Sequence, residues 1–284
     1  MAAALTSTFY FMKKDPLHLV EKPYELNYEP QVGQPRTNMT ISPVKDLSVT
    51  DIRNSKSKYS FEKNGFEVVN IDSPLTHAEY DDETKVIEVY FSKVAEVLKK
   101  FLGAERVQVF DYMIRKCDKD FPIYTENFYK YKQPSSIVHV DTTPQQTRKL
   151  IERMNFNEAE TLLKKRHQYI NVWKPLRGPV EEWPLALCDP SSVEKSDYIA
   201  RDYVEVDSYI ETYHLYQRPS QKWYYLSNQT EQEAWVFLQS DSKPDSKMGV
   251  PHCSIPVRQN REHKGMLRES IEVRVLAFYD EEQT

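Results

Sequence analysis

The stretch SIVHVDTTPQQ, from Ser136 to Gln146, places a histidine and an aspartate two residues apart in an apolar run that ends at a proline. Residues i and i+2 of a β-strand point to the same face of the strand. If this run is extended, His139 and Asp141 converge and can bind one ion. So short a motif also occurs by chance, and the alternative is a solvent-facing polar pair at a strand end.

The composition limits the classes of protein that this chain can represent. Its 284 residues have a formal net charge of −5 and no basic cluster, so we expect no nucleic-acid partner. Only 6 residues are glycine, and no GxGxxG or GxxxxGK pattern is present, which argues against nucleotide binding. The three cysteines are far apart and form no CxxC, so zinc on cysteine is not expected.

The same features predict where the protein works. The first residues lack a signal-peptide pattern, and no run of 18 apolar residues occurs, so we expect no membrane association. An odd number of scattered cysteines suits a reducing compartment, and we expect a cytoplasmic location.

The element pattern is mixed at first and then dominated by short strands. Ile87, Tyr90, Phe91, Val94, Val97, Leu98 and Phe101 form one helical stripe within residues 82–102, and Gly103 follows it as a stop signal. The run RVQVFDYMIRK alternates as a strand, and YSFEKNGFEVVNI predicts a strand, a turn and a second strand. Thr143, Pro144 and Gln146 suit the N-cap, the first position and the capping box of a helix that lies before His167.

Short β-branched or aromatic runs follow Tyr169, separated by Pro, Asp and Ser. This order favours a mixed α+β fold, a double-stranded β-helix (jelly-roll or cupin-like) barrel backed by helices. No linker divides the chain, so we expect one domain over residues 1–284. Within it we expect an extended N-terminal arm (1–60), a helix with the first sheet strands (61–135), and the jelly-roll core (136–284).

A metal site built on His139 and Asp141 needs a third ligand. An imidazole with a carboxylate begins the facial triad of non-haem Fe(II) oxygenases, which is completed by a second histidine. The candidates are His167, His214, His252 and His263. His252, in GVPHCSI, and His214, in ETYHLYQ, lie in expected strands, whereas the other two are expected at the surface.

A possible carboxylate receptor follows His252 after 16 residues. Arg268 and Ser270 in RESIEVR again have the i, i+2 spacing, and a guanidinium with a neighbouring hydroxyl offers several donors to a carboxylate. The alternative is that Arg268 forms an ion pair with Glu269 or Glu272. Arg274 has the same parity and is a rival anchor.

Together these segments resemble a known family. An HxD motif, a distant histidine and an RxS motif occur in this order in 2-oxoglutarate-dependent oxygenases. The stretches FEKNGFEVV, VHVDTTPQ, YINVWKPLRGPVEEWPLALCD, KWYYLSNQTEQEAWVF, DSKPDSKMGVPHCSI and RESIEVRVLAFYD resemble a mostly fungal group of these enzymes. It includes gibberellin-desaturase-like proteins and the hydroxylase/desaturase of the aspergillic acid pathway. The resemblance covers nearly everything after about Thr50.

The resemblance assigns roles to residues of this chain. It implies the metal ligands His139, Asp141 and His252, the 2-oxoglutarate anchor Arg268 and Ser270, and Asn171 and Trp173 beside the cosubstrate. The chain departs from the family pattern at Leu238 and Ile255, and the first departure affects the expected pocket. Cys253 is expected to pack on the opposite face of its strand. Tyr131, Tyr216, Trp223, Tyr224 and Tyr225 are candidate pocket walls or core aromatics.

The implied cofactors are Fe(II), 2-oxoglutarate and O2. The implied reaction is hydroxylation, desaturation or oxidative ring closure of a small molecule of secondary metabolism. Two alternatives remain: a redox-neutral cupin-like isomerase or hydrolase with the same His/Asp/His site, and a binding protein without catalysis. The substrate and the oligomeric state are not determined by the sequence.

Overall fold

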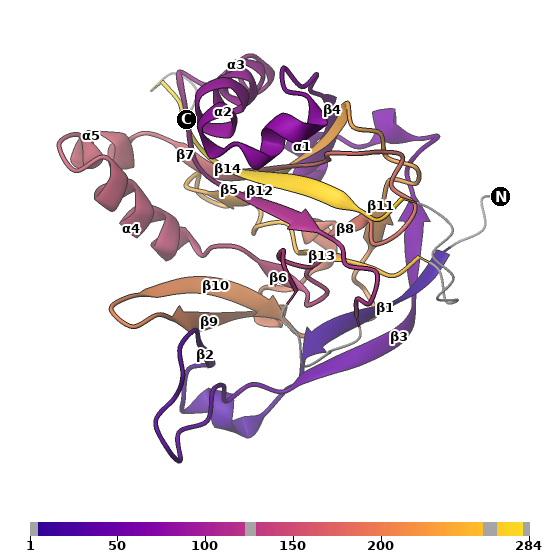
Figure 1. Cartoon of the computed structure of the whole chain (residues 1–284). Helices are drawn as coiled ribbons and strands as arrows, with labels where there is room; N and C mark the ends of the chain where they lie inside the picture. The colour runs from indigo at the N-terminus through magenta and orange to yellow at the C-terminus, as the bar shows by residue number, and fades with distance from the viewer. Residues whose placement is uncertain (1–4, 123–128, 258–265, 281–284) are drawn as a thin grey trace.

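Two β-sheets packed face to face form the body of the protein (Figure 1). The computed structural model describes residues 5–122, 129–257 and 266–280. This arrangement confirms the expected mixed fold, a jelly-roll barrel backed by helices. None of the helices in the described part of the chain is long and apolar enough to cross a membrane.

The smaller sheet has five strands, and every neighbouring pair is antiparallel. Their order is β4 (Phe66–Asn70), β12 (Glu233–Asp241), β7 (His167–Pro175), β14 (Glu269–Phe278) and β5 (Arg106–Lys116). The alternation of RVQVFDYMIRK thus predicted β5 with the bounds that it has.

The larger sheet has nine strands and carries the two expected histidine ligands, His139 and His252. Their order is β1 (Leu5–Met12), β3 (Ile41–Asp51), β11 (Trp223–Tyr225), β8 (Leu185–Cys188), β13 (His252–Ser254), β6 (His139–Val140), β10 (Tyr209–Leu215), β9 (Tyr198–Val204) and β2 (Tyr24–Leu26). The segment expected as an arm therefore supplies β1, β2 and β3, and its edge strand β2 pairs with β9.

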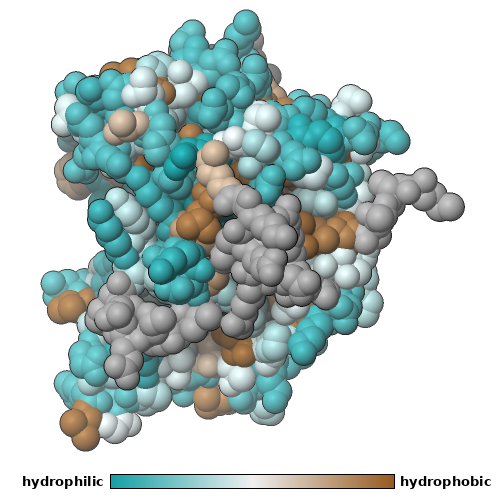
Figure 2. Space-filling view, turned by 45° about the vertical axis from the view of Figure 1, so that its right-hand side comes forward, coloured by the Kyte–Doolittle hydropathy of each residue, from teal (hydrophilic) through white to brown (hydrophobic). Residues whose placement is uncertain are grey.

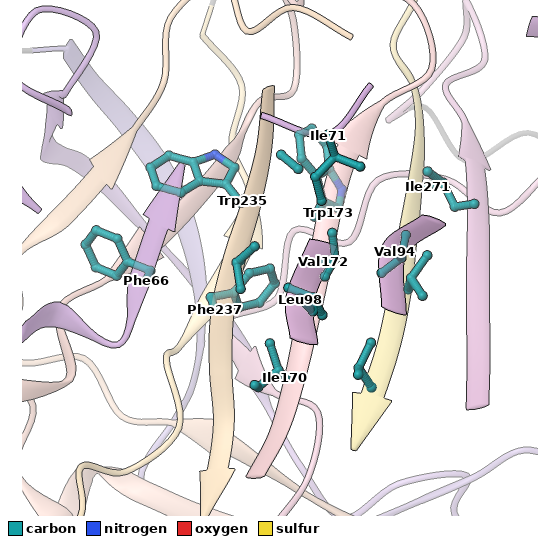
Figure 3. Close-up of a cluster of buried hydrophobic side chains, with 14 of the residues drawn as sticks. Phe66, Ile71, Val94, Leu98, Ile170, Val172, Trp173, Trp235, Phe237 and Ile271 are labelled. Carbon is teal, nitrogen blue, oxygen red and sulfur yellow. The ribbon is translucent and has the colours of Figure 1, made fainter. Parts of the chain in front are cut away.

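The long helical region covers the outer face of the five-stranded sheet. It consists of α2 (Glu83–Lys85), a π-helical turn (Val86–Tyr90) and α3 (Phe91–Leu102), and it ends at Gly103, whose φ of 65° suits a left-handed cap. Figure 3 shows Val94 and Leu98 of α3 against strands of this sheet. The π-helical turn shifts the buried face, so Val86 is buried and Ile87, expected in the stripe, is 45% exposed.

The predicted strand and turn before β4 are wrong. Residues Phe61–Asn64 form a short helix, α1, because the Ser60 side chain accepts a hydrogen bond from Lys63 N and Gly65 provides a left-handed end. Only the second predicted strand exists, as β4.

The helix after the HxD stretch begins as predicted. It comprises α4 (Pro144–Met154), and α5 (Ala159–Lys164) follows it; Thr143 Oγ1 accepts from Gln146 N at 3.0 Å. The second half of the expected capping box is absent, since the Gln146 side chain accepts from Glu211 N of β10 instead. The start of α4 is therefore fastened to β10.

A second hydrophobic core lies on the far face of the nine-stranded sheet. It includes Phe9, Phe11, Trp223, Tyr225 and Cys253, so Cys253 packs away from the barrel interior as expected. The opposite face of this sheet turns toward the five-stranded sheet. Figure 2 shows a largely hydrophilic exterior with hydrophobic side chains gathered near the middle of the visible face.

Candidate active site

His139, Asp141 and His252 meet inside the barrel. β6 and β13 are paired with His139 directly opposite His252, and the two ring centroids lie 4.4 Å apart. One possible ligand atom from each of the three side chains lies within 4.8 Å of the other two. Of the four histidines considered, the structure brings His252 to the HxD pair.

Hydrogen bonds fix both imidazole rings in the orientation that a metal needs. His139 Nδ1 lies 2.7 Å from Ile137 O, and His252 Nδ1 lies 3.1 Å from Val250 O. A carbonyl oxygen can only accept, so each Nδ1 carries the proton and each Nε2 presents a lone pair. Burial lowers the pKa of His252 to about 3, so its ring is neutral and able to bind a metal.

One oxygen of Asp141 is held by donors, and the other faces His139. Oδ1 lies 3.3 Å from His139 Nε2, whereas Oδ2 accepts from Asn171 Nδ2 at 2.8 Å and lies 3.4 Å from Arg274 Nε. Burial disfavours its charge, but the positive charge of Arg274 outweighs burial, so the pKa of Asp141 lies well below its ordinary value. The carboxylate is therefore ionised and oriented before any ligand binds.

The chemistry of these donors fits Fe(II). Two neutral imidazole nitrogens and one carboxylate oxygen are the protein ligands of the facial triad, which leaves the remaining coordination positions to other molecules. Asn171 is fully buried on β7 and supports the ligand carboxylate directly.

Replacing Asn171 by leucine should weaken Fe(II) binding by about 10- to 100-fold, because partners of metal ligands contribute this much to affinity. The fold should keep its stability, since Asn171 Oδ1 is buried without a partner and leucine has a similar volume. Metal titration and thermal unfolding of the variant check both statements. Unchanged Fe(II) affinity would contradict a supporting role for Asn171.

Arg268 is a buried cation with only neutral partners among the described residues. It is 3% exposed, its Nη1 donates to Trp183 O at 2.6 Å and to Ser254 Oγ at 2.5 Å, and its Nη2 donates to Ser270 Oγ at 3.0 Å. Its guanidinium carbon lies 5.1 Å from the centroid of the Trp173 ring. Burial, followed by the charge of Arg115, lowers the pKa of Arg268 to about 9.

The ion pairs considered for Arg268 do not form. Glu269 points to the other face of β14 and contacts His77, Lys116 and Arg177. Glu272 shares the inner face, and its carboxylate lies 3.7 Å from Arg274. Arg268 therefore keeps a positive charge that no described carboxylate neutralises within ion-pair distance, and an anion would offset the cost of burying it.

Arg274, the rival anchor, is surrounded by carboxylates. Its Nη1 donates to Asp111 Oδ2 at 2.6 Å, and it also approaches Asp141 and Glu272. Although burial opposes its charge, these acids raise the pKa of Arg274 well above its ordinary value. Arg274 orients the ligand Asp141. Because nearby carboxylates already neutralise its charge, it attracts an added anion less strongly than Arg268 does.

The sequence reasoning missed several residues around these groups. Ser254 follows His252 by two residues, so its i, i+2 spacing could have indicated that it faces the same side. Gln239 Oε1 accepts from Asp141 N at 2.8 Å, and the interior Arg115 donates to Gln133 O. Neither gave a local signal, because each contact joins a strand residue to a residue outside the strands, 98 and 18 positions away along the chain.

The other three candidate histidines are not part of the cluster with His139 and Asp141 that the described residues form. His167 begins β7 and is 4% exposed, so its expected surface position is wrong; the side chain is buried because β7 is a central strand. His263 lies outside the described residues. His214 is buried on β10, directly opposite His139.

Of the candidate wall aromatics, Trp223 and Tyr225 belong to the second core. Tyr224 packs against Tyr59 and Phe66, Tyr131 lies beneath Lys116, and Tyr216 faces Lys14. Leu238 pairs with Ile170 in the larger core cluster, and Ile255 lies in the second core.

The class of protein follows from comparison with known families. The sequence model of the family described as oxidoreductase/YMDC permease-like domain matches residues 9–278. The chain belongs to this family. It is also similar to fungal proteins named as hydroxylase/desaturases and Fe(II)/2-oxoglutarate-dependent dioxygenases.

Individual relatives match over most of their length. The Fe(II)/2-oxoglutarate-dependent dioxygenase nvfI of Aspergillus novofumigatus is 30% identical over 261 residues, covering 89% of this chain and 91% of the relative. The hydroxylase/desaturase efuI of Hormonema carpetanum is 28% identical over 274 residues, covering 89% and 88%. A solved structure of the iron and alpha-ketoglutarate-dependent endoperoxidase NvfI has a TM-score of 0.85 and 26% identity, covering 98% and 99% of the two chains.

Proposed function

We propose that this protein is an Fe(II)- and 2-oxoglutarate-dependent dioxygenase that oxidises a small organic molecule of secondary metabolism by hydroxylation, desaturation or ring closure. The observation that carries the proposal is a buried guanidinium with no carboxylate partner in the described chain, in the same barrel as a His/Asp/His cluster. A metal centre that needs no carboxylate cosubstrate has no use for such a cation. The names of the relatives support the same activity.

Each group then has a defined task. His139, Asp141 and His252 would hold Fe(II), which supplies the oxygen-activating chemistry when 2-oxoglutarate is bound. Arg268, with Ser270 and Ser254, would receive the distal carboxylate of 2-oxoglutarate through charge-assisted hydrogen bonds. Asn171 and Arg274 would keep Asp141 in place.

Trp173 lies under the Arg268 guanidinium and is 2% exposed. Its ring would exclude water from the carboxylate site, which strengthens the interaction between guanidinium and carboxylate. Trp173 would therefore act through Arg268, while Asn171 acts through the metal ligand Asp141.

Succinate release tests the proposal directly. The Fe(II)-loaded protein with 2-oxoglutarate should convert it to succinate when O2 is admitted, even slowly and without the organic substrate. Glutarate, which lacks the keto oxygen, is the matched control and should not be consumed. Stoichiometric metal binding with no effect of 2-oxoglutarate would instead support a redox-neutral metalloenzyme, and the absence of metal binding would support a binding protein.

A further inference from the structure

Three unpartnered polar atoms lie on one face of the β9–β10 hairpin beside the metal centre. They are His214 Nδ1, Thr212 Oγ1 and Arg201 Nε, each buried without a hydrogen-bond partner among the described residues. His214 is 3% exposed and Thr212 is 9% exposed. Buried polar groups are nearly always paired, so three such atoms in one place indicate a ligand that supplies the missing partners.

The strand register places these atoms relative to the metal ligands. His214 is directly opposite His139, and Thr212 is directly opposite Arg201. Thr212 lies two residues from His214 on the same face, which is about 7 Å along the strand. The three side chains therefore form a polar band on the interior face of the sheet, next to the segment that carries His139 and Asp141.

The charges in the polar band favour a neutral partner. His214 is 3% exposed and its Nδ1 has no hydrogen-bond partner among the described residues, so the side chain can take part in a further hydrogen bond. The charge of Arg201 is already balanced, because its Nη1 donates to Glu25 Oε2 of β2 at 3.0 Å. What remains is the Nε–H of Arg201 and the hydroxyl of Thr212, which can donate to an uncharged oxygen.

Beyond the polar band, the same face becomes apolar. Ile210 and Tyr203 are directly opposite each other, one step further from the metal centre than Thr212 and Arg201. Ile210 is 38% exposed, so this step reaches the surface of the hairpin. A molecule that occupies the whole face needs a hydrocarbon part over Ile210 and Tyr203 and an oxygen at the polar band.

We propose that His214, Thr212 and Arg201 form a substrate subsite that binds a carbonyl oxygen of an otherwise apolar organic molecule and orients it toward the metal centre. This inference rests on the proposed function, since it takes the bound molecule to be the substrate of that centre.

Ligand-observed NMR with simple probes tests the subsite. The full chain is loaded with Zn(II), which has no redox chemistry, and with 2-oxoglutarate. The probes are 2-decalone, decalin and decalin-2-carboxylate, which share a skeleton and differ in the oxygen group. Wild type should bind the ketone about tenfold more tightly than the hydrocarbon, as expected for one or two added hydrogen bonds in a buried site.

Substitutions on the two faces of β10 separate the subsite from general effects. Thr212→Val and His214→Phe should reduce the preference for the ketone to about twofold or less, while the binding of decalin stays unchanged. Tyr213→Phe removes a hydroxyl from the opposite face of the same strand and should leave the preference intact. A preference that survives both inner-face substitutions would overturn the proposal.

The remaining outcomes are also decisive. If wild type binds 2-decalone no more tightly than decalin, the subsite is contradicted. If wild type binds decalin-2-carboxylate more tightly than 2-decalone, a neutral ligand is contradicted. The binding of Zn(II) and 2-oxoglutarate is measured separately in each sample. A wild type that binds both cofactors but shows no preference for the ketone defeats the subsite alone. A wild type that prefers the ketone but binds neither cofactor defeats the proposed function alone.

Discussion

His139→Ala is expected to abolish stoichiometric iron binding and, with it, succinate formation. The imidazole supplies one of three protein ligands, and its Nε2 is oriented by the bond from Nδ1 to Ile137 O. Loss of a ligand should lower Fe(II) affinity by more than the roughly 100-fold that an outer partner contributes. Metal analysis after gel filtration and a succinate assay check the result.

His214→Ala is the matched control for this experiment. His214 and His139 are register partners on adjacent strands, yet only His139 belongs to the cluster with Asp141 and His252. The His214 variant should therefore keep its iron. If iron remains bound one-to-one in the His139 variant, or is lost equally in both, the assigned ligand set is wrong.

Arg268→Met is expected to raise the half-saturating concentration of 2-oxoglutarate by about 100-fold or more. Two charge-assisted hydrogen bonds to one carboxylate are together worth about 3–6 kcal/mol, which corresponds to this change. Metal binding should not change. The fold should lose little stability, because removal of a buried cation without a carboxylate partner among the described residues offsets the loss of its hydrogen bonds to Trp183, Ser254 and Ser270.

Arg274→Met separates the two candidate anchors. Arg274 contacts Asp111 and Asp141, so its loss should weaken metal binding while the dependence on 2-oxoglutarate changes little at saturating metal. Arg268→Lys should bind 2-oxoglutarate more tightly than Arg268→Met but less tightly than wild type. The positive charge remains, but the paired planar donors of the guanidinium are lost. An unchanged half-saturation in the Arg268 variant would move the anchor to Arg274 or remove the cosubstrate from the proposal.

Local signals in the sequence predicted the elements whose structure depends on near neighbours. The alternation over Arg106–Lys116 and the cap at Thr143 describe interactions within a few residues, and both are present in the structure. The segment around Phe61 was mispredicted because a cap at Ser60 and a left-handed Gly65 make a helical turn from a pattern that also suits a strand.

The candidate site shows where sequence patterns reach their limit. Both His252 and His214 lie opposite His139, one on each neighbouring strand, so strand parity alone could not choose between them. The resemblance to known oxygenases made that choice. Strand parity also could not predict the different environments of Arg268 and Arg274. These environments depend on partners that other segments bring to the same face.

The position of β14 in the five-stranded sheet has a consequence for biosynthesis. Residues Glu269–Phe278 pair with β7 on one side and β5 on the other, although both partners leave the ribosome much earlier. Until this segment emerges from the ribosome, the edges of β7 and β5 that pair with β14 have no hydrogen-bonding partner, and Arg268 is absent. Premature termination upstream should therefore yield an aggregation-prone intermediate that depends on chaperones.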